Sequence, residues 1–240
     1  MENKIKRTLF LIADFVLPAK CPVCDRIQPP GRSICPECNQ TVKKVRSAYC
    51  MRCGKPLSDE TKITCTDCKI DTNLVERGRV VFEYGSVAGL LYKLKYSARF
   101  DYARYLGEEA AKVIEEEREE WKPDCIVPVP LHPNRKLERG YNQVEEVAKH
   151  IKRVTNIPVR TDLVRRVIDT KPLKYQSSDS RRNNLKNAFK LVRNDVKLES
   201  IIILDDFYTT GSTIQAVALE LKRLGVQKIY FVTLAAGKGM

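Results

Sequence analysis

The stretch from residue 201 to 214 constrains this chain more than any other, because it joins an apolar run, an acidic pair and a hydroxyl-rich loop. Four consecutive aliphatic residues, 201–204, predict a strand buried on both faces, and the apolar period becomes helical after the loop. Asp205 and Asp206 are expected to end the strand, and residues 209–213 to open the helix. This order predicts an α/β domain with a ligand at the carboxyl end of the strand.

The loop after this strand has the chemistry of a phosphate site. Its expected ligand groups belong to Thr209, Thr210, Gly211, Ser212 and Thr213. Glycine lets the backbone approach a phosphate closely, and a helix N-terminus favours negative charge. Because carboxylates repel phosphate, the acidic pair is expected to accept hydrogen bonds from sugar hydroxyls or to help hold a hydrated Mg²⁺. A ribose 5-phosphate fits both halves; the alternative is an ordinary N-capped helix beside two incidental acids.

The 240 residues suffice for one sizeable α/β domain and a small module, and 43% hydrophobic with 30% charged residues is a soluble globular balance. The formal net charge is +13. Residues 1–76 hold 13 basic and 9 acidic side chains (+4), and residues 77–240 hold 30 and 21 (+9). This excess suits polyphosphate ligands or nucleic acid, or it reflects a solvated basic surface.

Eight of the nine cysteines form four Cys-x-x-Cys pairs. Each pair presents two thiolates to one tetrahedral ion, and two pairs complete a closed Cys₄ site. We therefore expect two structural zinc ions, held by Cys21, Cys24, Cys35, Cys38, Cys50, Cys53, Cys65 and Cys68. Sequential and cross-braced pairing both use these residues, and disulfides are the alternative chemistry, which the regular spacing disfavours. Cys125, on an apolar strand, is expected to be a small core residue.

The first 18 residues have the apolar spacing of a short amphipathic helix, which Asp14 and Pro18 make too short to span a membrane. No small-residue cleavage site follows, so a cytoplasmic protein is expected. Packing of this helix on its neighbouring module is favoured over contact with a membrane surface or a partner. The expected organisation is this helix (1–18), a double Cys₄ zinc module (19–76) and an α/β domain (77–240).

Between the cysteines and the central stretch, the apolar pattern predicts further elements. Strands are expected at 80–84 and 125–130, helices at 87–96, 102–120 and 144–151, and a last strand at 228–234. The acidic run Glu115–Glu120 is interpreted as a solvated helix face. Prolines near both ends predict a loop of fixed shape from Leu131 to Gln143.

Two motifs carry a resemblance to known proteins. Ile-Leu-Asp-Asp-Phe-Tyr-Thr-Thr-Gly-Ser-Thr, at 203–213, resembles the phosphoribosyl-pyrophosphate signature of type I phosphoribosyltransferases. Val-Pro-Val-Pro-Leu-His-Pro-Asn-Arg-Lys-Leu-Glu-Arg-Gly-Tyr-Asn-Gln, at 127–143, together with the tandem cysteine pairs, is similar to the ComF family of competence-associated, phosphoribosyltransferase-like proteins. The likeness covers almost the whole chain. It implies a cytoplasmic bacterial protein with an N-terminal zinc module, a Rossmann-like, mostly parallel sheet with a hood, and a link to uptake of single-stranded DNA.

The resemblance places the segment from Leu131 to Gly140 at the pyrophosphate. Arg135, Arg139 and Gly140 would contact it, with Arg139 preferred because the adjacent glycine permits close approach. Alternatively, Arg139 and Asn142 hold the loop together. His132 is interpreted as structural rather than as a base, since no orienting carboxylate is evident from the sequence.

By the same resemblance, residues 160–193 form the hood and mobile loop. They hold ten basic and three acidic residues, and the polar segment 169–184 would close over pyrophosphate as a lid. Single-stranded DNA would suit this chemistry equally, with Tyr175 as a stacking surface. The segment is about three residues shorter than in the family pattern, so the correspondence of Arg182 and Asn184 to ligand contacts is weak.

The implied reaction is displacement of pyrophosphate at ribose C1 by a nitrogen nucleophile. Asp205 and Asp206 would be the catalytic residues that hold the ribose hydroxyls, with Mg²⁺ neutralising the leaving group. Purine-salvage relatives carry a third carboxylate three residues after the second acid. Here that position is Thr209, which disfavours a purine acceptor and leaves the acceptor unnamed.

Two classes of function remain open at this stage. The first is a phosphoribosyltransferase that binds phosphoribosyl pyrophosphate with Mg²⁺ and acts in DNA uptake. The second is a non-catalytic competence factor that binds single-stranded DNA or proteins of the competence machinery and keeps the pocket as a sensor or a remnant. Ligand-binding residues support both, because binding alone does not establish turnover.

Overall fold

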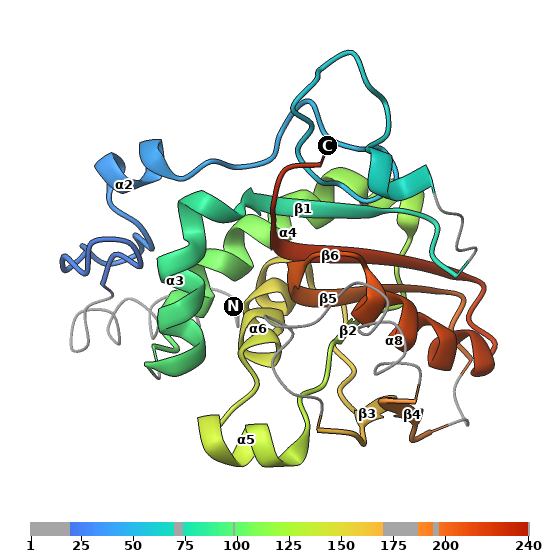
Figure 1. Cartoon of the computed structure of the whole chain (residues 1–240). Coiled ribbons are helices and arrows are strands. Elements are labelled where there is room, and N and C mark those ends of the chain that lie inside the picture. Colours follow the sequence, from blue (N-terminus) through green and yellow to red (C-terminus); the bar gives the residue numbers. More distant parts are fainter. Residues whose placement is uncertain (1–19, 70–73, 98, 170–186, 194–196, 240) are drawn as a thin grey trace, which may run out of the picture.

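The computed structural model describes residues 20–69, 74–97, 99–169, 187–193 and 197–239. Its centre is a sheet of four parallel strands in the order β1–β6–β5–β2 (Figure 1). The strands are β1 (Gly78–Glu83), β2 (Cys125–Pro128), β5 (Ser200–Tyr208) and β6 (Lys228–Ala236). The parallel α/β architecture expected from the sequence is confirmed.

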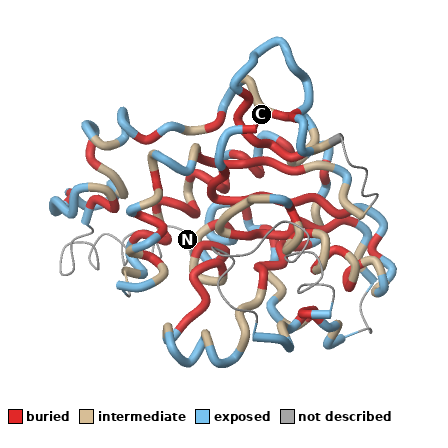
Figure 2. Tube along the Cα trace, viewed as in Figure 1, coloured by how far each residue is buried: buried red, intermediate tan, exposed pale blue. Residues whose placement is uncertain are grey.

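Both faces of this sheet are covered, which explains the unbroken apolar runs in β5 and β6. Helices α3 (Tyr84–Tyr96), α4 (Tyr102–Trp121) and α6 (Gln143–Thr155) form one apolar core with Ile202 and Leu204. Helix α8 (Ser212–Arg223) forms the other core with Ile201 and Ile203. Alternate residues of β5 therefore enter opposite cores, and Figure 2 shows the buried chain concentrated along these central strands. Cys125 is buried in the second core, as expected.

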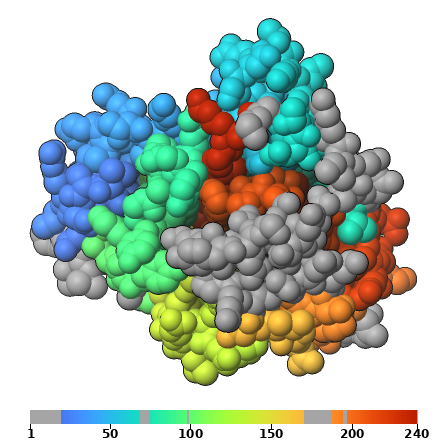
Figure 3. Space-filling model, in the orientation of Figure 1, coloured from blue at the N-terminus to red at the C-terminus, as the bar shows by residue number. Residues whose placement is uncertain are grey.

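A second, small sheet lies beside the main one. It pairs β3 (Val164–Arg166) with β4 (Phe189–Leu191) in antiparallel register. These strands fall inside the expected hood, while most of the expected lid, including Tyr175, Arg182 and Asn184, lies outside the described residues. Figure 3 shows β3 and β4 next to α5 (Pro133–Arg139) at one end of the molecule.

The cysteine-rich region contains little regular structure, apart from α2 (Pro36–Thr41) and a 3₁₀ turn at Thr66–Lys69. The expected helix at 1–18 lies outside the described residues. Among the helices that the structure describes, none is long and apolar enough to cross a membrane.

Two local expectations need correction. Strand β5 does not end at Asp205 and Asp206 but continues to Tyr208, because β6 runs alongside it as far as Ala236. The expected loop after β2 contains helix α5, whose N-terminus is capped by the His132 side chain and whose C-terminus is at Gly140, with φ +78°. Pro at the first helical position and Gly at the end are ordinary helix boundaries.

The segment between the two cysteine clusters is attached to the edge of the sheet. Val45 donates its backbone N–H to Val81 of β1, and Glu83 donates its own to Lys43, at 2.9 Å each. These bonds cover the free edge of β1 with an antiparallel segment and remove an exposed edge from the sheet.

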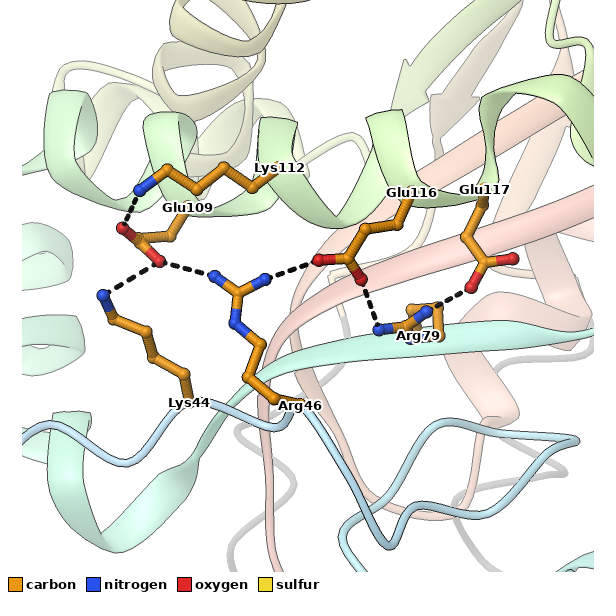
Figure 4. A network of polar contacts seen from close by, with 7 residues as sticks. All are labelled: Lys44, Arg46, Arg79, Glu109, Lys112, Glu116 and Glu117. Atoms are coloured by element: carbon orange, nitrogen blue, oxygen red, sulfur yellow. Dashed lines mark hydrogen bonds and ion pairs between the residues drawn. The ribbon is translucent and has the colours of Figure 1, made fainter.

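Basic side chains of this segment and of β1 contact the acidic face of α4 (Figure 4). Arg46 reaches both Glu116 (2.7 Å) and Glu109 (3.1 Å). Arg79 is buried and pairs with Glu116 at 3.0 Å and with Glu117. The interpretation of the acidic run as a solvated face is therefore wrong for Glu117, which is buried and pairs with Arg79 of β1 and with Arg77 just before that strand.

Removing the buried carboxylate should destabilise the fold more than removing an exposed one. Glu117→Gln is expected to lower the free energy of unfolding by about 3 kcal/mol, because it leaves Arg79 buried with a weaker partner. Glu116→Gln, whose side chain is 45% exposed, should cost about 1 kcal/mol or less. Denaturant unfolding of both variants measures the difference, and equal effects would contradict it.

Candidate functional site: two Cys₄ clusters and the carboxyl end of β5

The eight paired cysteines form two separate clusters in sequential order. The first contains Cys21, Cys24, Cys35 and Cys38, and the second contains Cys50, Cys53, Cys65 and Cys68. Within each cluster the sulfur atoms lie within 4.8 Å of one another, and the closest pairs are 3.6–3.7 Å apart. Tetrahedral zinc with bonds of 2.3 Å separates its sulfurs by about 3.8 Å. Both clusters fit a closed structural zinc site, and the pairing is not cross-braced.

The Asp25 carboxylate links the first cluster to the helices of the main domain. Asp25 follows the cysteine pair with φ +63°. It accepts hydrogen bonds from Lys93 (2.5 Å), from Arg99 (3.1 Å) and from the Tyr102 hydroxyl. The first cluster therefore holds the C-terminal part of α3 against the start of α4.

The acidic pair lies near the carboxyl end of β5, where the parallel sheet presents its ligand edge. Asp205 is buried and accepts a hydrogen bond from the backbone N–H of Asp206 at 2.8 Å. The Asp206 carboxylate accepts a hydrogen bond from Gln143 Nε2 at 2.6 Å and lies 3.0 Å from Lys95 Nζ. The two acids thus differ in their partners although they are adjacent in sequence.

These environments shift the pKa values of the two carboxyl groups in opposite directions. Burial, and then the neighbouring Asp206 charge, raise the pKa of Asp205 to about 7. Burial also acts to raise the pKa of Asp206, but the charge of Lys95 and the bond from Gln143 outweigh it and lower that pKa. Near neutral pH the pair therefore carries less than its full two negative charges, and the Asp206 charge faces Lys95.

The loop expected to bind phosphate begins directly after β5. Gly211 is the N-cap residue of α8 and has φ +75°. No side-chain hydrogen bond therefore caps this end of the helix. A Cβ on this glycine would lie 2.6 Å from the Tyr208 hydroxyl, so the position requires glycine. Thr210 Oγ1 and Ser212 Oγ are 2.7 Å apart. Thr209, Ser212 and Thr213 are half-buried at the same turn. Free amides, hydroxyls and a helix N-terminus are thus brought together, as an anion site requires.

The segment after β2 is anchored by buried polar contacts. Asn142 donates to the Val129 carbonyl at 3.0 Å and accepts from the Val144 amide at 3.0 Å. The buried Tyr141 hydroxyl donates to the Leu94 carbonyl of α3. Of the two expected loop-holding residues, Asn142 has that role.

Arg139 lies toward the acidic pair rather than within the loop. It donates to Gln143 Oε1 at 3.1 Å, and its guanidinium lies 5.0 Å from the centre of the exposed Tyr96 ring. Because Gln143 also bonds Asp206, Arg139 and the acidic pair share a neighbour. The space beside Gly140 is open.

Arg135 points elsewhere, toward the hood. Its Nε donates to Asp169 at 3.2 Å, and Asn134 donates to the same carboxylate at 3.3 Å. His132 Nδ1 lies 3.6 Å from Asp169 and accepts the Asn134 amide. Asp169 is therefore the carboxylate near His132 that the sequence did not reveal. Nδ1 of His132, however, already accepts the hydrogen bond that caps α5.

Sequence reasoning missed the part that five residues have in this site, namely Lys95, Tyr96, Gln143, Arg166 and Asp169. Burial and the charge of Arg135 lower the pKa of Arg166, while Asp205 acts in the opposite direction. Only Gln143 had a local signal, because it begins the helix that Asn142 caps. Lys95 is an ordinary helix lysine in sequence, and only the fold brings it to Asp206.

Comparison with known families agrees with this architecture. Residues 12–69 match a double zinc ribbon domain, and residues 103–239 match a phosphoribosyl transferase domain. The fold and the matches define a protein with a phosphoribosyl transferase domain that is preceded by a double zinc ribbon.

Three relatives match over most of the chain. Competence protein F of Haemophilus influenzae is 29% identical over 84% of this chain and 90% of its own length. DNA utilization protein YhgH of Salmonella typhi is 30% identical (82% and 87%), and competence protein ComFC of Bacillus subtilis is 25% identical (79% and 78%). The chain belongs to the ComF family of phosphoribosyl transferase domain proteins.

Zinc content should follow the two clusters. The purified protein is expected to hold two zinc ions, and Cys24→Ser should reduce this to one, because a closed Cys₄ site loses affinity with one ligand. Cys125→Ala, outside both clusters, should keep both ions. Metal analysis of the three proteins measures this, and one ion in the unaltered protein would contradict it.

The acidic pair should titrate as two unlike groups in the ligand-free protein. Carboxyl-carbon NMR is expected to show Asp205 with a pKa of about 7, and Asp206→Asn should lower that pKa because a neighbouring negative charge is removed. Asp162, which Arg160 holds at a pKa of about 2, serves as the unaffected reference. An Asp205 that titrates in the ordinary range for aspartate would contradict the described burial.

Proposed function

We propose that this chain binds phosphoribosyl pyrophosphate together with Mg²⁺ at the end of β5, and that it acts as a phosphoribosyltransferase. The observation that carries the proposal is that strand β5 leads directly into both halves of such a site, the acidic pair and the phosphate loop. Asp205 and Asp206 lie near its end, and the turn at Gly211 follows after a few residues. In this proposal residues 77–240 form the transferase domain, residues 19–76 its zinc module and residues 1–18 a separate helix.

The two halves would bind the ribose 5-phosphate part of the ligand. Thr209–Thr213 would hold the 5-phosphate with backbone amides and hydroxyls. The carboxylates of Asp205 and Asp206 would accept hydrogen bonds from the ribose hydroxyls or from water on Mg²⁺. Bound Mg²⁺ supplies charge neutralisation of the pyrophosphate leaving group.

The pyrophosphate would lie toward the cations of the α5 segment. Arg139 and Arg135 are the candidate cations for the pyrophosphate, and Gly140 leaves space for an approaching anion. In the ligand-free structure Arg135 pairs with Asp169, and Asp206 pairs with Lys95. Binding would exchange these internal pairs for ligand contacts, with pyrophosphate replacing Asp169 at Arg135.

The acceptor is a nitrogen nucleophile of unassigned identity. Thr209 stands where purine-salvage enzymes have a carboxylate that serves the purine, so a purine is disfavoured. The names of the relatives connect them with competence and DNA utilization, and we place this chain in the same process, in the cytoplasm, as part of DNA uptake.

A second candidate function is non-catalytic binding of single-stranded DNA or of a competence protein. Exposed aromatic side chains favour it: Tyr92 and Tyr96 are 62% and 60% exposed, and their rings are 4.9 Å apart on α3. Arg139 lies over Tyr96. Such a surface can stack bases beside a cation.

Calorimetric titration of the zinc-loaded protein with phosphoribosyl pyrophosphate and Mg²⁺ tests the proposal. Micromolar binding is expected, and the Asp205→Asn/Asp206→Asn variant should bind about a hundredfold more weakly, because charged hydrogen bonds to the ribose are lost. Asp169→Asn is the matched control. It removes a carboxylate that competes for Arg135, so its affinity should be unchanged or higher.

Absence of binding by the unaltered protein would overturn the proposal. If binding is found, product formation over a panel of bases and amines separates an enzyme from a sensor. Retention of single-stranded DNA that falls steeply with salt, without any product, would favour the second function.

A further inference from the structure

The second cysteine cluster adjoins the phosphate loop as well as the sheet. Cys50, Cys53 and Cys65 are buried in the same apolar core as α8, and Tyr208 packs against that core. Tyr208 is the last residue of β5 and directly precedes Thr209. One aromatic side chain therefore lies between a metal site and the loop that would bind phosphate.

Tyr208 is held from three sides. Its ring is parallel to that of Phe231 on β6, with centres 5.1 Å apart and an interplanar angle of 3°. Lys55 Nζ lies 5.4 Å from the ring centre. The hydroxyl packs at Gly211, where even a Cβ would clash at 2.6 Å. A displacement of this ring would therefore displace the turn that begins α8.

Lys55 lies between the two cysteine pairs of the second cluster in sequence and contacts the second of them through Asp67. Its side chain is 7% exposed and donates to Asp67 at 2.7 Å, so that it bridges the two cysteine pairs of the cluster. Its carbonyl accepts the Cys50 amide at 2.8 Å. The C-terminal end is attached here too, since the Gly239 amide donates to the Pro56 carbonyl at 2.9 Å. The place of Lys55 over Tyr208 thus depends on the folded cluster.

We propose that Tyr208 is a positioning residue that couples the second zinc ribbon to the phosphate loop, so that metal at the second Cys₄ site stabilises the conformation of Gly211 that receives the phosphate. That the Gly211 turn receives a phosphate rests on the proposed function, whereas the coupling between the ribbon and the turn is a property of the ligand-free protein. The first ribbon contacts α3 and α4 through Asp25 and Ser33, and it provides the internal reference.

Substitution of Tyr208 tests the coupling. Tyr208→Leu should shift the amide NMR signal of Gly211 and speed its hydrogen exchange in the ligand-free protein, and weaken ribose 5-phosphate binding about tenfold. Tyr208→Phe, which keeps the ring, should bind within about threefold of the unaltered protein. Tyr230→Leu removes the ring that stacks on Trp121 in the opposite core, and it should leave Gly211 unchanged.

Metal replacement provides a measurement that does not depend on mutation. With cadmium in both clusters, addition of ribose 5-phosphate should shift the cadmium NMR signal of the second site and not that of the first, because coupling is reciprocal. Equal response of both signals, or a Gly211 amide that is the same in Tyr208→Leu, would overturn the proposal. If the unaltered protein fails to bind ribose 5-phosphate, the proposed function fails, and the Gly211 amide still decides the coupling.

Discussion

The parallel pairing of β5 with β6 is the interaction on which the other parts of the structure depend. It runs from the Ser200–Lys228 pair to the Tyr208–Ala236 pair, and so continues beyond the acidic residues. The backbone groups of the acids are therefore held by a neighbouring strand and not by a mobile loop, and catalytic groups on strands are placed more accurately than groups on loops. The loop proper begins only at Thr209, where the backbone must turn into α8.

The zinc ribbons are attached to this sheet by two different kinds of contact. On the side of α4, basic residues contact a row of glutamates. Arg46 comes from the segment between the two ribbons, and Arg79 comes from strand β1. On the side of α8, the cysteines of the second ribbon enter the apolar core itself. A region this poor in apolar residues depends on metal for its own fold. Zinc at the second site would therefore support part of the core of the phosphoribosyl transferase domain as well as the ribbon.

The parts of the site that could be predicted are those encoded in short stretches. Cysteine spacing identified the eight cysteines of the two clusters but left their pairing open, and the run from Ile201 to Thr213 identified the strand, the acids and the loop, because each signal lies within a few residues. The continuation of β5 through Phe207 and Tyr208 was not predicted, although aromatic residues favour strands, because the two acids were expected to end the strand. Lys95 and Asp169 could not be found in this way, because only the folded chain brings them to Asp206 and Arg135. Helical periodicity likewise placed Glu117 on a face without showing that Arg79 would cover it.

The charges of the ligand-free site are paired internally, and this limits what can bind there. The charge of Asp206 is balanced by Lys95, and that of Arg135 by Asp169. The raised pKa of Asp205 reduces the negative charge that this carboxyl group carries. A free anion that takes Arg135 from Asp169 leaves the Lys95–Asp206 pair in place, so it gains contacts with only half of the site. In the proposed function, a ligand that brings both an anion and a divalent cation would replace both pairs, because the anion would take the place of Asp169 at Arg135 and the cation would take the place of Lys95 at Asp206. An unpaired buried charge costs several kcal/mol. Under the proposed function, charge balance therefore favours binding of the magnesium complex of a pyrophosphate ester over binding of the metal-free ester.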